Sequence, residues 1–314
     1  MIPVFFTIDD SYAPFLAAAL YSAIENASAQ NHYKAIILHQ DVSEENRRRI
    51  EALARDWFEI EFVPMRQGLE SITDRMGSRL RCDYFTLTIY FRLFIPAMFP
   101  EFDKAIYIDS DVVVPGDLAE LYHIDLGDNY IGACPDFSIA DVPPLVRYTV
   151  EAVGMEPGKY VNSGVLLMNL KALREKELDK QFLRLLNTYQ FDSIAPDQDY
   201  LNAMCRGRIH YLDECWDTMP NDSKPPLEAP KLIHYNLFSK PWCYDGVQYG
   251  DVFWKYARGS GFYPEIRAYK DHYSDEQKQS DAACMELLVR RGTQIAGSAG
   301  TFRKVFESGE KVRL

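Results

Sequence analysis

The chain has 314 residues, of which 47% are hydrophobic, 13% aromatic and 25% charged, and its formal net charge is −12 at pH 7. This composition is typical of a folded globular protein and excludes a disordered chain, a collagen-like fibre and a coiled coil. The negative charge argues against sequence-independent binding of nucleic acid, because a protein that binds phosphates in this way must replace their counterions with its own cations.

The sequence predicts neither a membrane span nor a signal peptide. The longest early uncharged run, residues 11–24, is 14 residues long, whereas a spanning helix needs about 18 or more. It follows two aspartates instead of the basic residues that open a signal peptide. The six cysteines contain no C-x-x-C pair, which is typical of reduced thiols and not of a disulfide framework or a zinc site. We therefore expect a cytoplasmic protein.

The charge is unevenly distributed. Residues 285–314 carry six Lys or Arg against three Asp or Glu, so this end of the acidic chain has a net charge of +3. Such a basic tail is most often a solvated helix, and the alternative is a peripheral contact with the inner face of a membrane or with an acceptor. The 20 Tyr and 18 Phe provide material for the aromatic interface of a homo-oligomer.

Strand-like and helix-like segments alternate along the chain, which predicts an α/β fold with a mostly parallel sheet covered by helices. Strands are expected at residues 2–8, 35–39, 59–63, 104–108, 112–114, 130–134, 161–168 and 231–235. The first of these is a short continuous apolar run, which indicates a strand buried on both faces of the sheet.

Helices are expected between these strands. The first follows Asp9, and the second begins at Asp41, with Glu44 completing a capping box. A third is expected over residues 84–99, with Pro96 kinking its end, and a fourth after Lys171.

From about residue 259 the apolar periodicity weakens. We therefore predict one α/β domain, residues 1–258, and a helical C-terminal appendage, residues 259–314, which contacts the acceptor, a membrane or another copy of the chain.

Three polar clusters follow predicted strands, which is where ligands bind in open α/β sheets. They are Asp9 with Asp10, residues 109–111 (Asp-Ser-Asp), and His234. Two carboxylates one residue apart can hold one hard cation, and an imidazole with phosphate oxygens would complete an octahedral Mn²⁺ or Mg²⁺ site. Such an ion acts as a Lewis acid on a departing diphosphate.

Each cluster also has a simpler interpretation. A second Asp-x-Asp at residues 197–199 shows that the pattern arises by chance, and Asp109 and Asp111 could be turn or capping carboxylates. His234 could be a core histidine, and Asp9 the N-cap of the first helix, a role compatible with a ligand contact. The apolar runs that flank residues 109–111 favour the metal site, because they place both carboxylates at a crowded sheet edge.

Residues 109–113 also match the Asp-x-Asp-x-Val motif of haloacid-dehalogenase-like phosphatases. There the first aspartate attacks a phosphoryl group and the second protonates the leaving group. That motif normally follows the first strand of its fold, whereas three predicted strands precede it here, so this interpretation is the less favoured one.

The chain resembles glycosyltransferase family 8, the retaining enzymes that include lipopolysaccharide galactosyltransferases and glycogenin. The resemblance covers roughly residues 1–258 and rests on motifs in the family's order: FFTIDDSYAPFL, IYFRLFIP, KAIYIDSDVVVPGDL, YVNSGVLLMNLKAL with the later PDQDYLNAM, and LIHYNLFSKPW. It implies a GT-A fold, a UDP-glucose or UDP-galactose donor and Mn²⁺, with Mg²⁺ as the alternative. It also implies a saccharide, glycolipid or glycoprotein acceptor.

The same resemblance implies roles for individual residues. The metal ligands would be Asp109, Asp111 and His234. The nucleotide would be held by Thr7 and Asp9 at the uracil, by Tyr12 stacked on the base, by the backbone of Ser110 at the ribose and by Lys240 at the diphosphate. Hydroxyls of the donor sugar would be held by Arg92, Asn162 and Asp197, and the side-chain oxygen of Gln198 would face the anomeric carbon.

The implied reaction is hexosyl transfer with retention, in which stabilisation of the leaving diphosphate is the main catalytic effect. Gln198 is expected to stabilise charge, since a primary amide is a poor nucleophile. Asp136 would contact the acceptor, the alternative being a turn carboxylate. Leu237 stands where the family commonly has a glycine that lets the backbone approach the diphosphate, which puts that loop in question. The alternative function is a catalytically silent nucleotide-sugar-binding scaffold, although the intact set of ligand residues argues against it.

Overall fold

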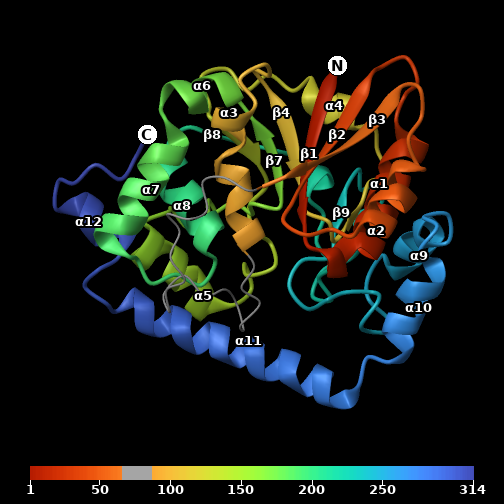
Figure 1. Ribbon diagram of the computed structural model, residues 1–314. Helices are drawn as coiled ribbons and strands as arrows, with labels where there is room; N and C mark the ends of the chain where they lie inside the picture. Colours follow the sequence, from red (N-terminus) through yellow and green to blue (C-terminus); the bar gives the residue numbers. More distant parts are fainter. Residues whose placement is uncertain (66–86) are drawn as a thin grey trace.

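The computed structural model describes residues 1–65 and 87–314, and its centre is a sheet of seven strands in the order β3-β2-β1-β4-β7-β6-β8 (Figure 1). Four strands run parallel to one another: β1 (Ile2–Ile8), β2 (Tyr33–His39), β3 (Phe58–Pro64) and β4 (Ala105–Ile108). β7 (Val165–Met168) is antiparallel to its neighbours β4 and β6 (Ile131–Ala133), and β6 is parallel to β8 (Ile209–Tyr211). The mostly parallel sheet predicted from the sequence is therefore confirmed.

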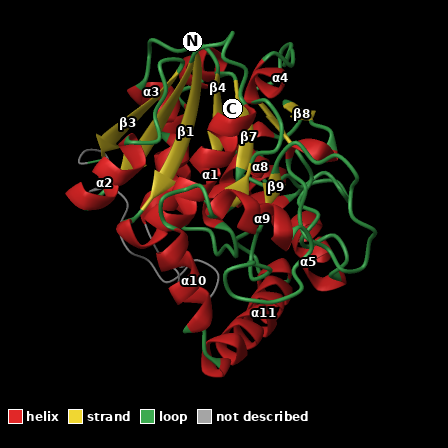
Figure 2. Cartoon of the chain, turned by 90° about the vertical axis from the view of Figure 1, so that its right-hand side faces the viewer, coloured by secondary structure: helices red, strands yellow, loops and turns green. Residues whose placement is uncertain are grey.

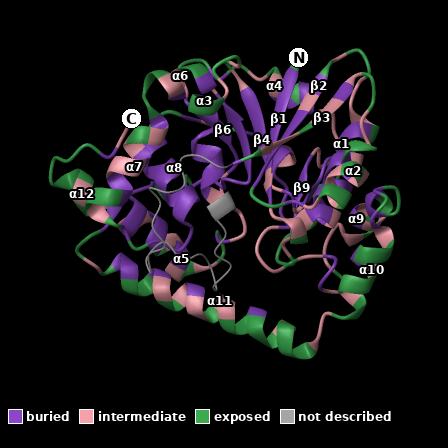
Figure 3. Ribbon diagram, viewed as in Figure 1, coloured by how far each residue is buried: buried purple, intermediate pink, exposed green. Residues whose placement is uncertain are grey.

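Both faces of this sheet are buried. In β1, Val4 and Phe6 belong to one apolar cluster, and Phe5 between them belongs to a second cluster on the other face. This alternation follows from the two-residue period of a strand, and both faces are apolar because helices cover each of them. The buried strands are surrounded by helices that are exposed on their outer surfaces (Figure 3).

Two groups of helices cover the two faces. The cluster that contains Val4 includes residues of α1 (Ala13–Asn26), α2 (Glu44–Glu51), α4 (Leu118–Tyr122), α9 (Gly250–Ala257) and α10 (Tyr263–Asp271). The cluster that contains Phe5 includes residues of α3 (Ile95–Met98), α5 (Pro143–Tyr148), α6 (Leu170–Glu175), α7 (Leu178–Tyr189) and α8 (Pro196–Cys205).

The last part of the chain is helical, as expected. α11 (Asp275–Ala296) crosses the end of the molecule opposite the N-terminus, and α12 (Phe302–Glu307) follows it (Figures 1 and 2). The later turns of α11 pack on α5, where Gly292 lies against Leu145. Further along, the ring of Phe302 stacks on Phe191, with 3.9 Å between the ring centroids.

A second, two-stranded sheet lies beside the carboxyl end of β4. β5 (Val112–Val113) is antiparallel to β9 (Ile233–His234), and Val112 is opposite His234. The chain therefore leaves the large sheet at Ile108 and enters the small sheet at Val112, with Asp109, Ser110 and Asp111 between them.

Several boundaries differ from those expected. The helix predicted over residues 84–99 is wrong: the described part is a 3-10 helix, Leu87–Leu93, followed by α3. Pro96 lies in the first turn of α3 instead of kinking a helix end, because the first turn does not need the backbone N–H that proline lacks. Tyr84 lies outside the described residues.

The predicted cap of the second helix is also wrong. α2 begins after Ser43, whose side chain accepts from the Asn46 N–H, so Ser43 and not Asp41 is the N-cap. The helix after Lys171 is two helices, α6 and α7, since Glu177 between them takes a left-handed conformation with φ of 52°. The strand predicted over residues 161–168 begins only at Val165.

Within residues 1–65 and 87–314, no helix is long and apolar enough to cross a membrane. In the same part of the chain, the cysteines are free thiols, at Cys134, Cys205, Cys215, Cys243 and Cys284. Cys82 lies outside the described residues.

Candidate functional site

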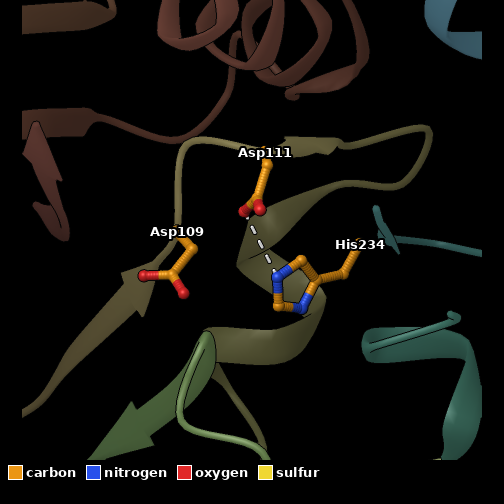
Figure 4. A group of neighbouring side chains, drawn as sticks. All are labelled: Asp109, Asp111 and His234. Carbon is orange, nitrogen blue, oxygen red and sulfur yellow. Dashed lines mark ion pairs between the residues drawn. The ribbon is translucent and has the colours of Figure 1, made fainter. Parts of the chain in front are cut away.

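Asp109, Asp111 and His234 come together at the junction of the two sheets. Each offers one ligand atom, and these atoms lie within 4.8 Å of one another (Figure 4). The antiparallel pairing of β5 with β9 produces this grouping, because it places Val112 opposite His234 and lets the Tyr235 N–H donate to the Asp111 carbonyl. Asp109 and His234, which are 125 positions apart in the sequence, are thus brought into one cluster.

A glycine makes room for this cluster. A Cβ atom at Gly164 would lie 2.3 Å from His234 Cε1 and 2.8 Å from Asp109 Oδ2, which is closer than van der Waals contact allows. The Gly164 carbonyl also accepts from the Asp109 N–H. Only glycine allows the backbone before β7 to approach the two ligand side chains this closely.

Asp217 holds the imidazole of His234 from the other side. His234 Nδ1 lies 3.0 Å from Asp217 Oδ1, and Nε2 lies 3.3 Å from Asp111 Oδ1. Burial lowers the pKa of His234, but Asp111 and Asp217 outweigh burial and raise it to about 10. Without a cation, His234 is therefore protonated at neutral pH and shared between two carboxylates. A metal ion at Nε2 would replace that proton.

These three residues fit a divalent metal ion. Two carboxylates and one imidazole are a suitable donor set for Mn²⁺. The Asp217 carboxylate behind Nδ1 supplies the hydrogen bond that usually orients a metal-binding histidine. If an ion binds, Asp109, Asp111 and His234 would hold it.

Two cations already partner the two acidic residues. Lys240 Nζ lies 2.5 Å from Asp111 Oδ2 and donates to the Tyr235 carbonyl, and Arg92 Nη2 lies 2.9 Å from Asp109 Oδ1. Burial raises the pKa of Asp111, but Lys240 and His234 outweigh it and hold that pKa well below its usual range. Both cations are buried or nearly so, which makes the site a positively charged receptor for an anion once a metal occupies the carboxylates.

A cavity of about 460 Å³ opens beside the cluster. Its lining comes from the carboxyl end of β1, from residues 109–111, from the loop after β9 and from the C-terminal segment. The sequence-predicted residues that line it are Thr7, Asp9, Tyr12, Arg92, Asp109, Ser110, Asp111 and Lys240. This size and the mixture of aromatic and charged walls suit a small anionic ligand.

Local hydrogen bonds position the residues from the first strand. Asp9 caps the 3-10 helix Asp10–Tyr12 by accepting from the Ser11 and Tyr12 N–H groups. The N-cap role expected from the sequence is therefore confirmed for this short helix, and it leads the chain into α1. Thr7 Oγ1 lies 2.7 Å from Tyr107 Oη, which in turn donates to Asp109.

Four other predicted residues form a buried network next to the cavity. Gln198 Oε1 accepts from the Ser163 N–H at 3.0 Å, and its Nε2 donates to Asp136 Oδ2 at 2.8 Å. Asp197 accepts from Ser163 Oγ and pairs with Arg92, and Asn162 Oδ1 accepts from the Gly164 N–H. The structure thus brings Asn162, Asp197, Gln198 and Asp136 together, but as a hydrogen-bonded layer behind the cavity lining.

Leu237 takes the backbone conformation that a glycine would favour. Its φ is 57°, in the left-handed region, so the loop keeps this turn although a side chain is present. The half-buried Leu237 side chain lines the cavity beside Lys240. The side chain at position 237 therefore occupies part of the cavity that a glycine would leave open.

Three residues of the site were missed by the sequence analysis: Gly164, Tyr107 and Asp217. Gly164 stood within a quoted motif, and a glycine inside a predicted apolar strand was a usable signal, because it often marks a close approach of the backbone to another group. No local pattern marks Asp217, which reaches His234 only because the Thr218 carbonyl accepts from the His234 N–H in the folded chain.

The model of glycosyl transferase family 8 matches residues 3–246. A provisionally assigned glycosyltransferase of Haemophilus influenzae is 30% identical over 220 residues, which cover 70% of this chain and 64% of that protein. The lipopolysaccharide 1,2-glucosyltransferase of Escherichia coli K12 is 28% identical over 201 residues, with 56% of each chain covered. The matched region therefore spans less than two thirds of either relative.

Solved structures share the fold. The galactosyltransferase LgtC in complex with donor and acceptor sugar analogues superimposes with a TM-score of 0.69 at 27% identity, over 82% of this chain and 96% of that chain. The apo structure of the bifunctional glycosyltransferase WbbM gives a TM-score of 0.71 at 25% identity, over 85% of this chain and 51% of that chain. These likenesses confirm the expected GT-A type of fold.

Proposed function

The chain belongs to glycosyl transferase family 8, and on that premise we propose that it is a retaining, Mn²⁺-dependent glycosyltransferase. It moves glucose or galactose from a UDP-sugar to a saccharide or glycoconjugate acceptor in glycan biosynthesis. The observation that carries the proposal is the cluster of Asp109, Asp111 and His234. Its two carboxylates line a cavity that Lys240 and Tyr12 also line.

Each wall of the cavity has a part in this proposal. Thr7, Asp9 and Tyr12 hold the uracil and the backbone of Ser110 meets the ribose. Lys240 exchanges its carboxylate partner Asp111 for the diphosphate, since the ammonium is a compact charge suited to phosphate oxygens. Arg92 Nη1 donates to the Ser163 carbonyl at 2.6 Å, which fixes the guanidinium at the mouth of the sugar-binding region.

In the proposed reaction, the bond between the anomeric carbon and the diphosphate oxygen breaks. The bond between that carbon and the acceptor oxygen forms on the same face, and the hydroxyl proton leaves with the diphosphate. A bound Mn²⁺ would supply Lewis-acid stabilisation of the leaving group. Lys240 contributes a second positive charge, and the layer of Asp197, Asn162 and Gln198 orients the hexose.

The test is UDP release from a panel of UDP-sugars without acceptor, with Mn²⁺ or with EDTA. We expect release from UDP-glucose or UDP-galactose that requires the metal and falls by about 10²-fold or more in Asp111→Asn. The exposed Asp128 provides a control, since Asp128→Asn should release UDP at the wild-type rate. Metal-dependent UDP binding without turnover would favour the scaffold, and release of phosphate from a phosphomonoester would favour the phosphatase.

The proposal extends to the organisation of the chain. Residues 1–258 form the transferase unit, and residues 259–314 form an appendage to it. The protein acts in the cytoplasm, where the net charge of +3 on residues 285–314 favours a peripheral contact with an anionic membrane surface. Sedimentation with vesicles that contain or lack anionic lipid tests this contact.

A further inference from the structure

A second cavity, of about 580 Å³, adjoins the first. The two share Leu237, Phe238 and Asp281 in their linings. Leu237 and Phe238 belong to the loop that carries Lys240, so the second cavity begins where the donor cavity ends. Its lining includes residues from the loop after β6, from residues 219–223 and from the helix α11.

One face of α11 forms a wall of this cavity. The residues that line it are Lys278, Asp281, Ala282 and Met285. Their spacing of three, four and seven positions places them on a single side of an α-helix. This helix lies outside residues 3–246, the part that matches the family. The wall therefore lies outside the part of the chain that the family model matches.

The wall is held in place at both ends. Asp281 is buried and accepts from the hydroxyls of Tyr244 and Tyr273, at 2.6 and 2.7 Å. Further along the helix, Leu288 and Ile295 are buried against the core. Figure 3 shows the same change along α11, which is mostly exposed near its start and increasingly buried toward its end. α11 is thus a fixed part of the cavity.

The chemistry of the lining suits a neutral saccharide. Asp141 accepts from Asn221 and Ser223, whose hydrogen bonds lower the pKa of its carboxyl, so it is ionised at neutral pH. The described lining residues include three acidic residues, Asp141, Asp222 and Asp281, and one basic residue, Lys278. Lys278 already forms an ion pair with Asp275. Carboxylates accept hydrogen bonds from sugar hydroxyls, and their excess repels an anionic ligand.

Apolar side chains complete the lining. Phe137, Phe238 and Met219 lie among the polar groups and can pack against the C–H face of a sugar ring or against an apolar aglycone. This combination of a few polar groups with aromatic and aliphatic walls is typical of small-molecule sites.

A chain of hydrogen bonds connects this cavity with Gln198. Asn236 Nδ2 donates to Ser138 Oγ at 3.1 Å, and Ser138 Oγ donates to Asp136. The other oxygen of Asp136 accepts from Gln198. Asn236 and Ser138 line the second cavity, so a ligand there would lie next to the network that we assign to the transferred hexose.

We propose that the second cavity binds the acceptor, that the acceptor is a neutral saccharide, and that the face of α11 formed by Lys278, Asp281, Ala282 and Met285 selects it. This inference rests on the proposed transferase function. It assigns acceptor recognition to a segment outside the family match.

The test compares Ala282→Trp with Ala283→Trp. Both alanines are exposed on α11, but only Ala282 lines the cavity, so the two substitutions carry the same helix-propensity cost. Transfer from the UDP-hexose that the wild type hydrolyses is measured with octyl β-glucoside, octyl β-galactoside and the anionic octyl β-glucuronide. UDP release without acceptor is measured alongside.

We expect the wild type to use a neutral glycoside with a kcat/KM about tenfold or more above that of the glucuronide. Ala282→Trp should raise the KM for this glycoside about tenfold or more and leave UDP release without acceptor unchanged. Ala283→Trp should change neither. The inference is wrong if neither neutral glycoside is used while UDP release continues, if the glucuronide is used equally well, or if the two variants behave alike. Absence of metal-dependent UDP release from the wild type would instead refute the proposed function.

Discussion

His234 and Asp217 form a buried pair in which Nδ1 of the imidazole lies 3.0 Å from the carboxylate oxygen Oδ1. The pair directs the other ring nitrogen, Nε2, toward Asp111. Asp217 has an exposed fraction of 0%, contacts His234 and is not one of the three residues that could hold a metal ion, so it acts as a positioning residue. Its role can be separated from that of the ligands themselves.

Asp217→Asn should weaken Mn²⁺ binding by about 10- to 100-fold, since loss of the carboxylate charge makes the imidazole a poorer and less well oriented ligand. Titration of the protein with Mn²⁺, followed by the paramagnetic resonance of the free ion, measures this affinity. Asp213→Asn is the matched control, because Asp213 caps the neighbouring 3-10 helix without contacting His234. Equal Mn²⁺ affinity in the two variants would contradict the positioning role.

Gly164→Ala should displace the side chains of the cluster formed by Asp109, Asp111 and His234. The added methyl group would overlap His234 Cε1, so the imidazole must shift, and we expect a loss of about 1–3 kcal/mol in the free energy of unfolding together with weaker Mn²⁺ binding. At Gly300 no atom lies within 4 Å of an added Cβ, and Gly300→Ala should leave both quantities unchanged. Urea denaturation and Mn²⁺ titration provide the two measurements. Wild-type Mn²⁺ affinity in Gly164→Ala would show that the site tolerates the displacement.

At most positions an alanine variant is at least as stable as a glycine variant. Because Leu237 has a left-handed conformation, we expect the opposite order at this position. Leu237→Gly and Leu237→Ala both remove the side chain, but only glycine relieves the backbone strain, so the glycine variant should be more stable than the alanine variant by about 1 kcal/mol. Leu227, which has no positive φ, is the control. There the alanine variant should be at least as stable as the glycine variant. Urea denaturation of the four variants decides the order, and an alanine variant at 237 that matches the glycine variant contradicts the assigned strain.

The pKa of His234 predicts how stability depends on pH in EDTA. The folded-state pKa of about 10 lies above the usual histidine pKa of 6.5, so the stabilising contribution of the protonated His234 is fully present below pH 6.5 and is lost as the pH rises through 10. Between pH 7 and pH 9, the free energy of unfolding of the wild type should fall, relative to that of His234→Gln, by about 1.4 kcal/mol per pH unit. Denaturation at several pH values measures this difference. Parallel pH curves for the two proteins would show that the folded histidine is neutral.

The sequence predicted the elements that depend on local patterns. Continuous apolar runs identified the buried strands β1 and β4, and the apolar stripe after Asp9 identified α1. The sequence also singled out Asp109, Asp111 and His234, which the structure brings together. The two aspartates stood out because apolar runs flank them directly, and His234 because it lies in a motif of the family that the chain resembles. Boundaries were less accurate. Ser43 replaced Asp41 as a helix cap, and residues 161–164 left the strand pattern because they bond to residues such as Cys134.

Tertiary structure alone decided how the cluster is assembled and supported. The register between β5 and β9 places His234 next to Asp111, and the fold brings Asp217 behind the imidazole. The position of α11 across a second cavity also depends on distant contacts, such as those of Asp281 with Tyr244. Local sequence determined which residues could bind a metal or cap a helix, since these properties belong to side chains and their neighbours. Which of them meet was decided by long-range packing, because the free energy of such contacts is gained only when segments far apart in the chain are folded together.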